Sequence, residues 1–129
     1  MKLSELPAHV RDRVKMQLPV KGRAPRRGRM NKTEMEYRDS LEAARLAGEV
    51  LGYEFETLKL RLADGAWYCP DFVVFRADGD IQCVEVKGGF VREASMVRLK
   101  VAAERFRFFE FVLAQKKDGE WSSKRIGGP

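Results

Sequence analysis

The stretch Ile81-Gln-Cys-Val-Glu-Val-Lys-Gly-Gly89 decides the fold. It follows the tight turn Asp78-Gly-Asp80 and is rich in apolar and β-branched residues, so a strand is predicted from Ile81 to Lys87. Side chains alternate along a strand, which puts Glu85 and Lys87 on one face and the two intervening valines on the other. Two neighbouring charges on a central strand require a partner or a function.

Two further strands are predicted upstream. Tyr53 to Leu62 places apolar residues among threonine, lysine and arginine and ends at the turn Asp64-Gly65. Trp67 to Phe75 is aromatic and β-branched and contains Pro70-Asp71, so its proline is expected at a strand end or an irregular edge position. The three strands are predicted to be consecutive, antiparallel and joined by short loops.

Pairing through the Asp78 turn would bring Asp71 near Glu85, with Lys87 in the same pocket. Two carboxylates suit a hard divalent cation such as Mg²⁺, with Mn²⁺ as a substitute, and leave coordination sites for water and phosphate oxygens. The cation would acidify a water, and Lys87 would position that water or stabilise developing charge. Gly88 and Gly89 would let a sugar-phosphate backbone approach closely. This chemistry is phosphodiester hydrolysis.

A helix is predicted from Asn31 to about Gly48. Thr33 followed by Glu36 three residues later is a capping-box pattern, which gives Glu36 a structural task. Glu34 falls on the inward edge of the helix and is therefore the better functional candidate. A first-turn carboxylate favoured by the helix dipole explains Glu34 equally well.

A second helix is predicted near Glu93 to Phe106, with Ala94, Val97 and Val101 as its apolar stripe. Arg98 and Lys100 lie off this stripe, where they could meet phosphates or simply be solvated. The phenylalanines that follow, up to Val112, favour a core strand, and Lys117 to Trp121 favours a hairpin.

Length and composition indicate one folded domain of 129 residues, 44% of them hydrophobic. No apolar stretch approaches the roughly 18 residues that cross a bilayer, and there is no signal-peptide core, so a cytoplasmic location is expected. Cys69 and Cys83 are interpreted as reduced packing residues, because two thiols supply neither a disulfide framework nor a four-ligand zinc site. His9 is interpreted as structural.

Charge is concentrated at the N-terminus. Residues 1–32 hold ten Lys or Arg and two acids, a balance of +8, whereas residues 33–129 hold fifteen and seventeen, a balance of −2. Residues 1–30 are predicted to form a basic arm, with a short helix that is capped by Ser4, carries Val10, Val14 and Leu18 as its apolar stripe and ends before Pro19. Cations that would neutralise phosphates are Lys21, Arg23, Arg26, Arg27, Arg29 and Lys32.

Two other interpretations of this arm stay open. Arg27-Gly-Arg29 resembles the centre of an AT-hook, although Met30 stands where a proline normally follows. A solubilising tail is the other alternative.

Pro70-Asp71 followed by Glu85-Val-Lys87 resembles the PD-(D/E)XK signature of restriction-like endonucleases and archaeal-type Holliday-junction resolvases. The surrounding residues 31–113 are similar to small phage and prophage proteins of that superfamily. The resemblance implies an α/β (α+β) fold with a restriction-endonuclease-like αβββαβ core and a mixed central sheet. It assigns Asp71 and Glu85 to the metal, Lys87 to catalysis, and Glu34 as an additional helical acid.

The resulting expectation is a nuclease domain over residues 31–129 that acts on DNA as a Mg²⁺-dependent endodeoxyribonuclease in a bacterium or a phage-infected host. Selectivity for branched or junction DNA is expected because the small domain has little surface for reading base sequence, and junction cutting would favour a homodimer. The alternative is a non-catalytic nucleic-acid-binding or phage assembly module on a nuclease fold. A third interpretation makes Glu85 and Lys87 a plain surface pair, with Asp71 in a turn.

Overall fold

The computed structural model describes residues 6–16 and 29–127. Its helices are α1 (Ala8–Arg11), α2 (Lys32–Leu46) and α3 (Glu93–Arg105). The main sheet has the order β2-β5-β6-β7-β8, formed by β2 (Val50–Phe55), β5 (Phe72–Arg76), β6 (Ile81–Gly88), β7 (Glu110–Lys117) and β8 (Glu120–Ile126). A smaller sheet has the order β1-β3-β4, formed by β1 (Val14–Met16), β3 (Leu58–Ala63) and β4 (Ala66–Tyr68).

The main sheet is mixed. Strands β6 and β7 are parallel and are joined through α3, whereas every other pair in this sheet is antiparallel. Taken in chain order, α2, β2, β5, β6, α3 and β7 form the αβββαβ arrangement that the resemblance implies. The predicted α/β (α+β) class with a mixed central sheet is confirmed.

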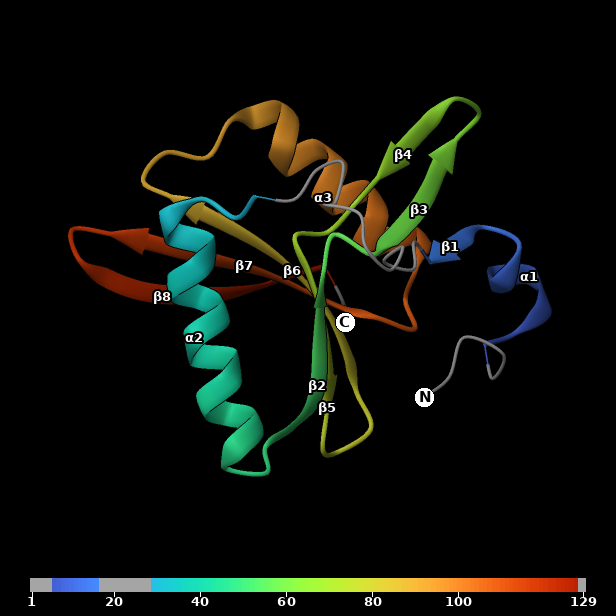
Figure 1. The fold of residues 1–129 in the computed structure, drawn as a ribbon. Coiled ribbons are helices and arrows are strands. Elements are labelled where there is room, and N and C mark those ends of the chain that lie inside the picture. Colours follow the sequence, from blue (N-terminus) through green and yellow to red (C-terminus); the bar gives the residue numbers. More distant parts are fainter. Residues whose placement is uncertain (1–5, 17–28, 128–129) are drawn as a thin grey trace.

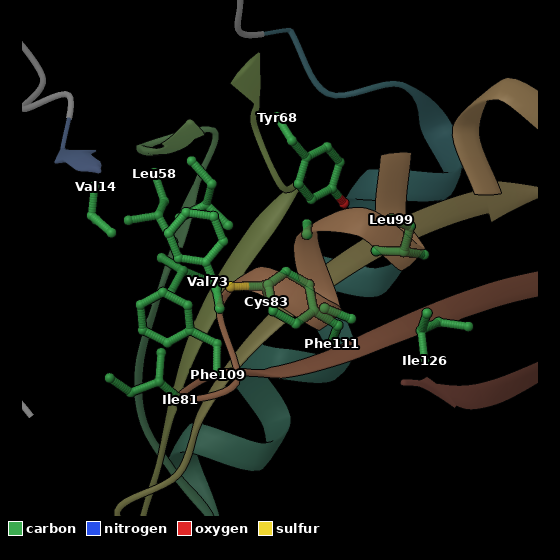
Figure 2. Packing of buried hydrophobic residues seen from close by; sticks show 14 of the residues in the cluster. Val14, Leu58, Tyr68, Val73, Ile81, Cys83, Leu99, Phe109, Phe111 and Ile126 are labelled. Carbon is green, nitrogen blue, oxygen red and sulfur yellow. The ribbon is translucent and has the colours of Figure 1, made fainter. Parts of the chain in front are cut away.

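Each face of the main sheet has its own core, as the alternation of β6 requires. Val84 and Val86 face α2, in a cluster with Leu41 and Phe72. Cys83 faces the other way, toward α3 and the small sheet (Figure 2). The cluster on that face includes Leu58, Leu60, Val73, Leu99, Ala102, Phe106, Phe111 and Ile126. In Figure 1, α2 covers one side of the sheet, and its N-terminal end reaches the end of β6.

The predicted strands 53–62 and 67–75 are each wrong as single elements. The first divides into β2 and β3, which lie in different sheets, and the second divides into β4 and β5. At the first break Glu56 has φ +51°, a left-handed conformation that interrupts the extended chain. At the second break stands Pro70, which has no N–H to give to a strand ladder. The small hairpin is thus an excursion from the main sheet.

Two predicted apolar stripes also differ from the structure. The N-terminal helix is only α1, because Val14 continues into a strand paired with β3; Ser4, Leu18 and Pro19 lie outside the described residues. Val10 and Val14 are buried in the core, so this segment packs on the domain itself. On α3 the buried residues are Leu99, Ala102 and Ala103, whereas Ala94 and Val97 are exposed.

Cys69 and Cys83 do not form a disulfide with each other, as predicted, and burial raises the pKa of the Cys83 thiol. His9 packs its ring 5.8 Å from that of Phe108. Within residues 6–16 and 29–127, no helix is long and apolar enough to span a membrane.

Candidate active site

Three carboxylates stand on one row across the main sheet. The register pairs Phe55 with Phe72 and Phe72 with Val84. The next row of this register holds Glu56 after Phe55, Asp71 before Phe72 and Glu85 after Val84. The Glu56 N–H donates to the carbonyl of Asp71 at 2.9 Å. Asp71 therefore lies opposite Glu85, as pairing through the Asp78 turn predicts.

Asp71 is held against β6 by its own side chain. Its Oδ2 accepts a hydrogen bond of 2.8 Å from the backbone N–H of Val86. Burial, and after it the negative charge of Glu85, raises the pKa of Asp71 to about 8, despite the opposing effect of the Val86 hydrogen bond. Both causes favour the protonated form of this carboxyl group when no cation is bound.

Glu85 is fixed from two sides. Its Oε2 accepts from the hydroxyl of Tyr68 at 3.1 Å, and its Oε1 lies 3.7 Å from the Nζ of Lys87. The Glu85 side chain is 12% exposed and that of Lys87 is 33% exposed, so the lysine stands at the open side of the pair. Burial, followed by the charge of Glu85, raises the pKa of Tyr68 well above its usual value. Tyr68 therefore acts as a neutral hydrogen-bond donor.

Glu34 reaches this row from the first turn of α2, and the predicted capping box around Thr33 and Glu36 is wrong. The box is formed instead by Asn31 and Glu34: the Glu34 N–H donates to Asn31 Oδ1 at 2.8 Å, and the Asn31 N–H donates to Glu34 Oε1 at 2.9 Å. Glu36 is ion-paired with Lys116. Glu34 is nevertheless buried at 9% exposure, on the inward edge where the sequence places it.

Glu34, Glu56 and Asp71 converge. One carboxylate oxygen from each lies within 4.8 Å of the other two. Glu56 is absent from the predicted site because one continuous strand was predicted for this region. A signal was present: Tyr53 and Phe55 are at odd positions, whereas the buried residues of β3 are at even ones. The shift of the apolar positions from odd to even numbers indicates a break in the strand near Glu56, the additional acid.

The predicted nucleic-acid-binding cations either lie on separate segments or fall outside the residues that the structure describes. Arg29, Lys32, Arg98 and Lys100 are exposed, the last two on α3. The other four, Lys21, Arg23, Arg26 and Arg27, lie outside the described residues.

No protein-family model matches the chain, and no curated protein matches its sequence. Among solved structures, it is similar to Hjc, a Holliday junction resolvase from the archaeal hyperthermophile Archaeoglobus fulgidus. That likeness has a TM-score of 0.49 and 20% identity, and covers 74% of this chain and 73% of Hjc. The protein SSO0001 is a second neighbour, with a TM-score of 0.43, 14% identity and coverage of 74% of this chain and 50% of that one.

Proposed function

We propose that the protein is a metal-dependent endonuclease that hydrolyses phosphodiester bonds in DNA. The observation that carries the proposal is the convergence of Glu34, Glu56 and Asp71 beside a Glu85–Lys87 pair. Acids of like charge are costly together at a buried or half-buried site, and the cost is relieved when one of them keeps its proton or when a cation binds between them. A plain surface pair of Glu85 and Lys87 does not account for the neighbouring acids.

The donor set fits a hard divalent cation. Carboxylate oxygens are the ligands that Mg²⁺ and Mn²⁺ prefer, and oxygens within 4.8 Å of one another can share one ion. Asp71, with Glu34, Glu56 and Glu85 as neighbours, would hold it. Because the pKa of Asp71 is about 8, cation binding near neutral pH would release its proton. When bound, the cation supplies positive charge to phosphate oxygens and acidifies water.

The lysine completes the chemistry. Hydrolysis adds a water oxygen to phosphorus, breaks one P–O ester bond and transfers a proton to the departing oxygen. The Lys87 Nζ stands at the open side of the site, where it would orient the attacking water and stabilise charge on the phosphate oxygens. Glu85 holds the lysine in place, and Tyr68 holds Glu85 in place.

The substrate is proposed to be DNA that carries a branch or junction, bound partly by the cations of residues 1–32. A four-way junction has two symmetric strands to cut, so a homodimer is proposed for that substrate. Sedimentation with and without junction DNA would test the stoichiometry.

The decisive experiment is cleavage of labelled duplex, nicked, single-stranded and four-way-junction DNA, and of RNA, in Mg²⁺, Mn²⁺ or EDTA. Lys87→Ala is expected to reduce cleavage at least 100-fold, the usual scale for losing one transition-state contact. Lys59→Ala, a lysine on β3 in the small sheet, is the matched control and should cut like the wild type.

Metal binding should be measured separately, by calorimetric titration of Mn²⁺ into the wild type and Asp71→Ala. A folded wild type that binds DNA but cuts nothing in any metal would favour the non-catalytic module. Equal Mn²⁺ affinity in both proteins would refute the metal site.

A further inference from the structure

A cleft of about 770 Å³ adjoins the candidate active site and is not used by the chemistry proposed above. It lies between the segment that follows Lys87, residues 88–91, and the β7–β8 hairpin, and both extend to the same side of the molecule in Figure 1. Thr33, at the start of α2, contributes to its wall. The cleft therefore begins where the catalytic strand ends.

The wall formed by residues 88–91 is fixed to the sheet. Gly89 adopts φ +73°, its N–H donates to the Lys116 carbonyl at 2.8 Å, and its own carbonyl accepts from the Gln115 side chain. Gly88 packs close to Thr33: an added Cβ would lie 3.2 Å from the Thr33 hydroxyl oxygen. The chain is thus held firmly just before it presents Phe90.

Phe90 has no packing role that explains it. Its side chain is 85% exposed, the highest value among the exposed large hydrophobic residues of the described chain. An exposed phenylalanine on a backbone that is fixed beside it offers its ring face to a flat apolar ligand without first having to be ordered. Nucleobases are such ligands, and they stack on aromatic rings with little dependence on sequence.

The opposite wall carries positive charge. Lys117 and Lys124 line the cleft and are exposed. The register aligns Glu85 with Leu113 and Leu113 with Lys124, so Lys124 continues the row that holds the acids, two strands away. Asp118 offsets one charge, and Lys116 also lines the cleft but is paired with Glu36. Cations along one side and an aromatic ring on the other suit a single strand, whose bases and phosphates are separately accessible.

We propose that this cleft binds an unpaired DNA strand next to the scissile phosphate, with a base stacked on Phe90 and phosphates contacting Lys117 and Lys124. The inference rests on the nuclease proposal and deepens it, because it defines the substrate class as DNA with an unpaired or distorted flank. A continuous duplex keeps its bases stacked on one another and offers none to Phe90.

Binding can be tested without cleavage. The probe is a DNA duplex with a single-stranded flank in which 2-aminopurine replaces one base at successive positions, titrated in EDTA or Ca²⁺. In the wild type, fluorescence at one or two flank positions should fall on binding, because stacking quenches this base. Phe90→Ala should abolish the quenching and weaken flank binding about tenfold, while binding of fully paired duplex stays within twofold. Phe90→Tyr should retain both effects.

Two controls separate stacking from general apolar contact. Phe90→Leu keeps an apolar side chain but not the ring, so it should behave like Phe90→Ala. Phe108→Ala removes another exposed phenylalanine, one that precedes β7 at the opposite end of the sheet, and should bind the flank like the wild type. A Lys117→Ala, Lys124→Ala double variant should reduce the salt slope of flank binding by about 1.4, at about 0.7 per phosphate contact.

The inference fails if quenching is absent in the wild type, or if Phe90→Ala or Phe90→Leu binds the flank as tightly as Phe90→Tyr. These outcomes are independent of catalysis: metal-dependent cutting without Phe90-dependent quenching would leave the nuclease proposal intact, and quenching without cutting would do the reverse.

Discussion

Asp71 Oδ2 accepts a hydrogen bond of 2.8 Å from the backbone N–H of Val86, the residue that follows Glu85. This bond holds the acid toward a second acid on the adjacent strand, and burial together with that second charge raises the pKa of Asp71 to about 8. Because the Asp71 carboxyl group is held in place and its protonated form is favoured, the stability of the metal-free protein is expected to depend on pH.

We expect stability in EDTA to decrease as pH rises from about 4 to about 8. The unfolded chain loses the Asp71 proton near pH 4, whereas the folded state keeps it to about 8, so folding is favoured most below the lower value. Asp71→Asn removes this dependence and should be more stable than the wild type at pH 9, by roughly 1–3 kcal/mol. Urea unfolding at several pH values, taken as the difference between the two proteins, measures it.

Divalent metal provides the complementary test. Mn²⁺ should stabilise the wild type at pH 8 and leave Asp71→Asn almost unchanged. An equal rise in the unfolding midpoint of both proteins would place the metal elsewhere.

Glu56 is expected to contribute to cation binding although it is absent from the sequence signature. Glu56→Gln should weaken Mn²⁺ binding roughly tenfold, because it removes one charge from a group of three close carboxylates. Glu54→Gln is the matched control, since Glu54 is exposed on β2, two residues before Glu56, and is not in that group. Calorimetry measures both, and equal losses would remove Glu56 from the site.

Glu34 and Glu36 should differ sharply when each becomes glutamine. Glutamine can replace Glu34 in the capping box, so Glu34→Gln should fold normally and lose roughly tenfold in Mn²⁺ affinity. Glu36→Gln disrupts only a partly exposed ion pair with Lys116 and should cost about 0.2–1 kcal/mol of stability without changing Mn²⁺ affinity. Thermal unfolding and metal titration together decide which acid serves the site.

The N-terminal cations should contribute salt-dependent affinity for DNA. Replacing five of them with glutamine is expected to reduce the slope of log binding constant against log salt by up to about 4.5 for duplex, at about 0.9 per phosphate contact. The substituted residues are Lys21, Arg23, Arg26, Arg27 and Arg29. Fluorescence anisotropy at several salt concentrations measures the slope. A solubilising tail would leave it unchanged.

Local pattern was sufficient to predict part of the site. The alternation of β6 and the turn before it bring Glu85, Lys87 and Asp71 together, because both depend on residues close in the chain. Contacts between distant segments were not predictable. The pattern Asn31 to Glu34 satisfies the capping rule as well as Thr33 to Glu36 does, and what distinguishes them includes an ion pair with Lys116, eighty residues away.

The fold, like the site, was predictable only in part. The order of the core elements and the mixed central sheet follow from the pattern of the chain and the resemblance, but the division between two sheets does not. On α3, Val97 and Leu99 both belong to plausible stripes, and only the strands packed against the helix make Leu99 the buried one. Hydrophobic periodicity identifies an apolar face of a helix, but it does not identify the elements that pack against that face.

The small sheet leaves the main sheet at Glu56 and rejoins it at Asp71, and the two ends are closed by one backbone hydrogen bond. Both residues at this closure carry carboxylates of the converging group, while Tyr68, near the return, positions a fourth. The β3–β4 hairpin therefore helps to fix the positions of these carboxylates. We therefore expect changes to its distant packing, as at Val14 or Leu60, to alter the spacing of the acids, so that cation affinity would depend on a sheet that holds none of these carboxylates.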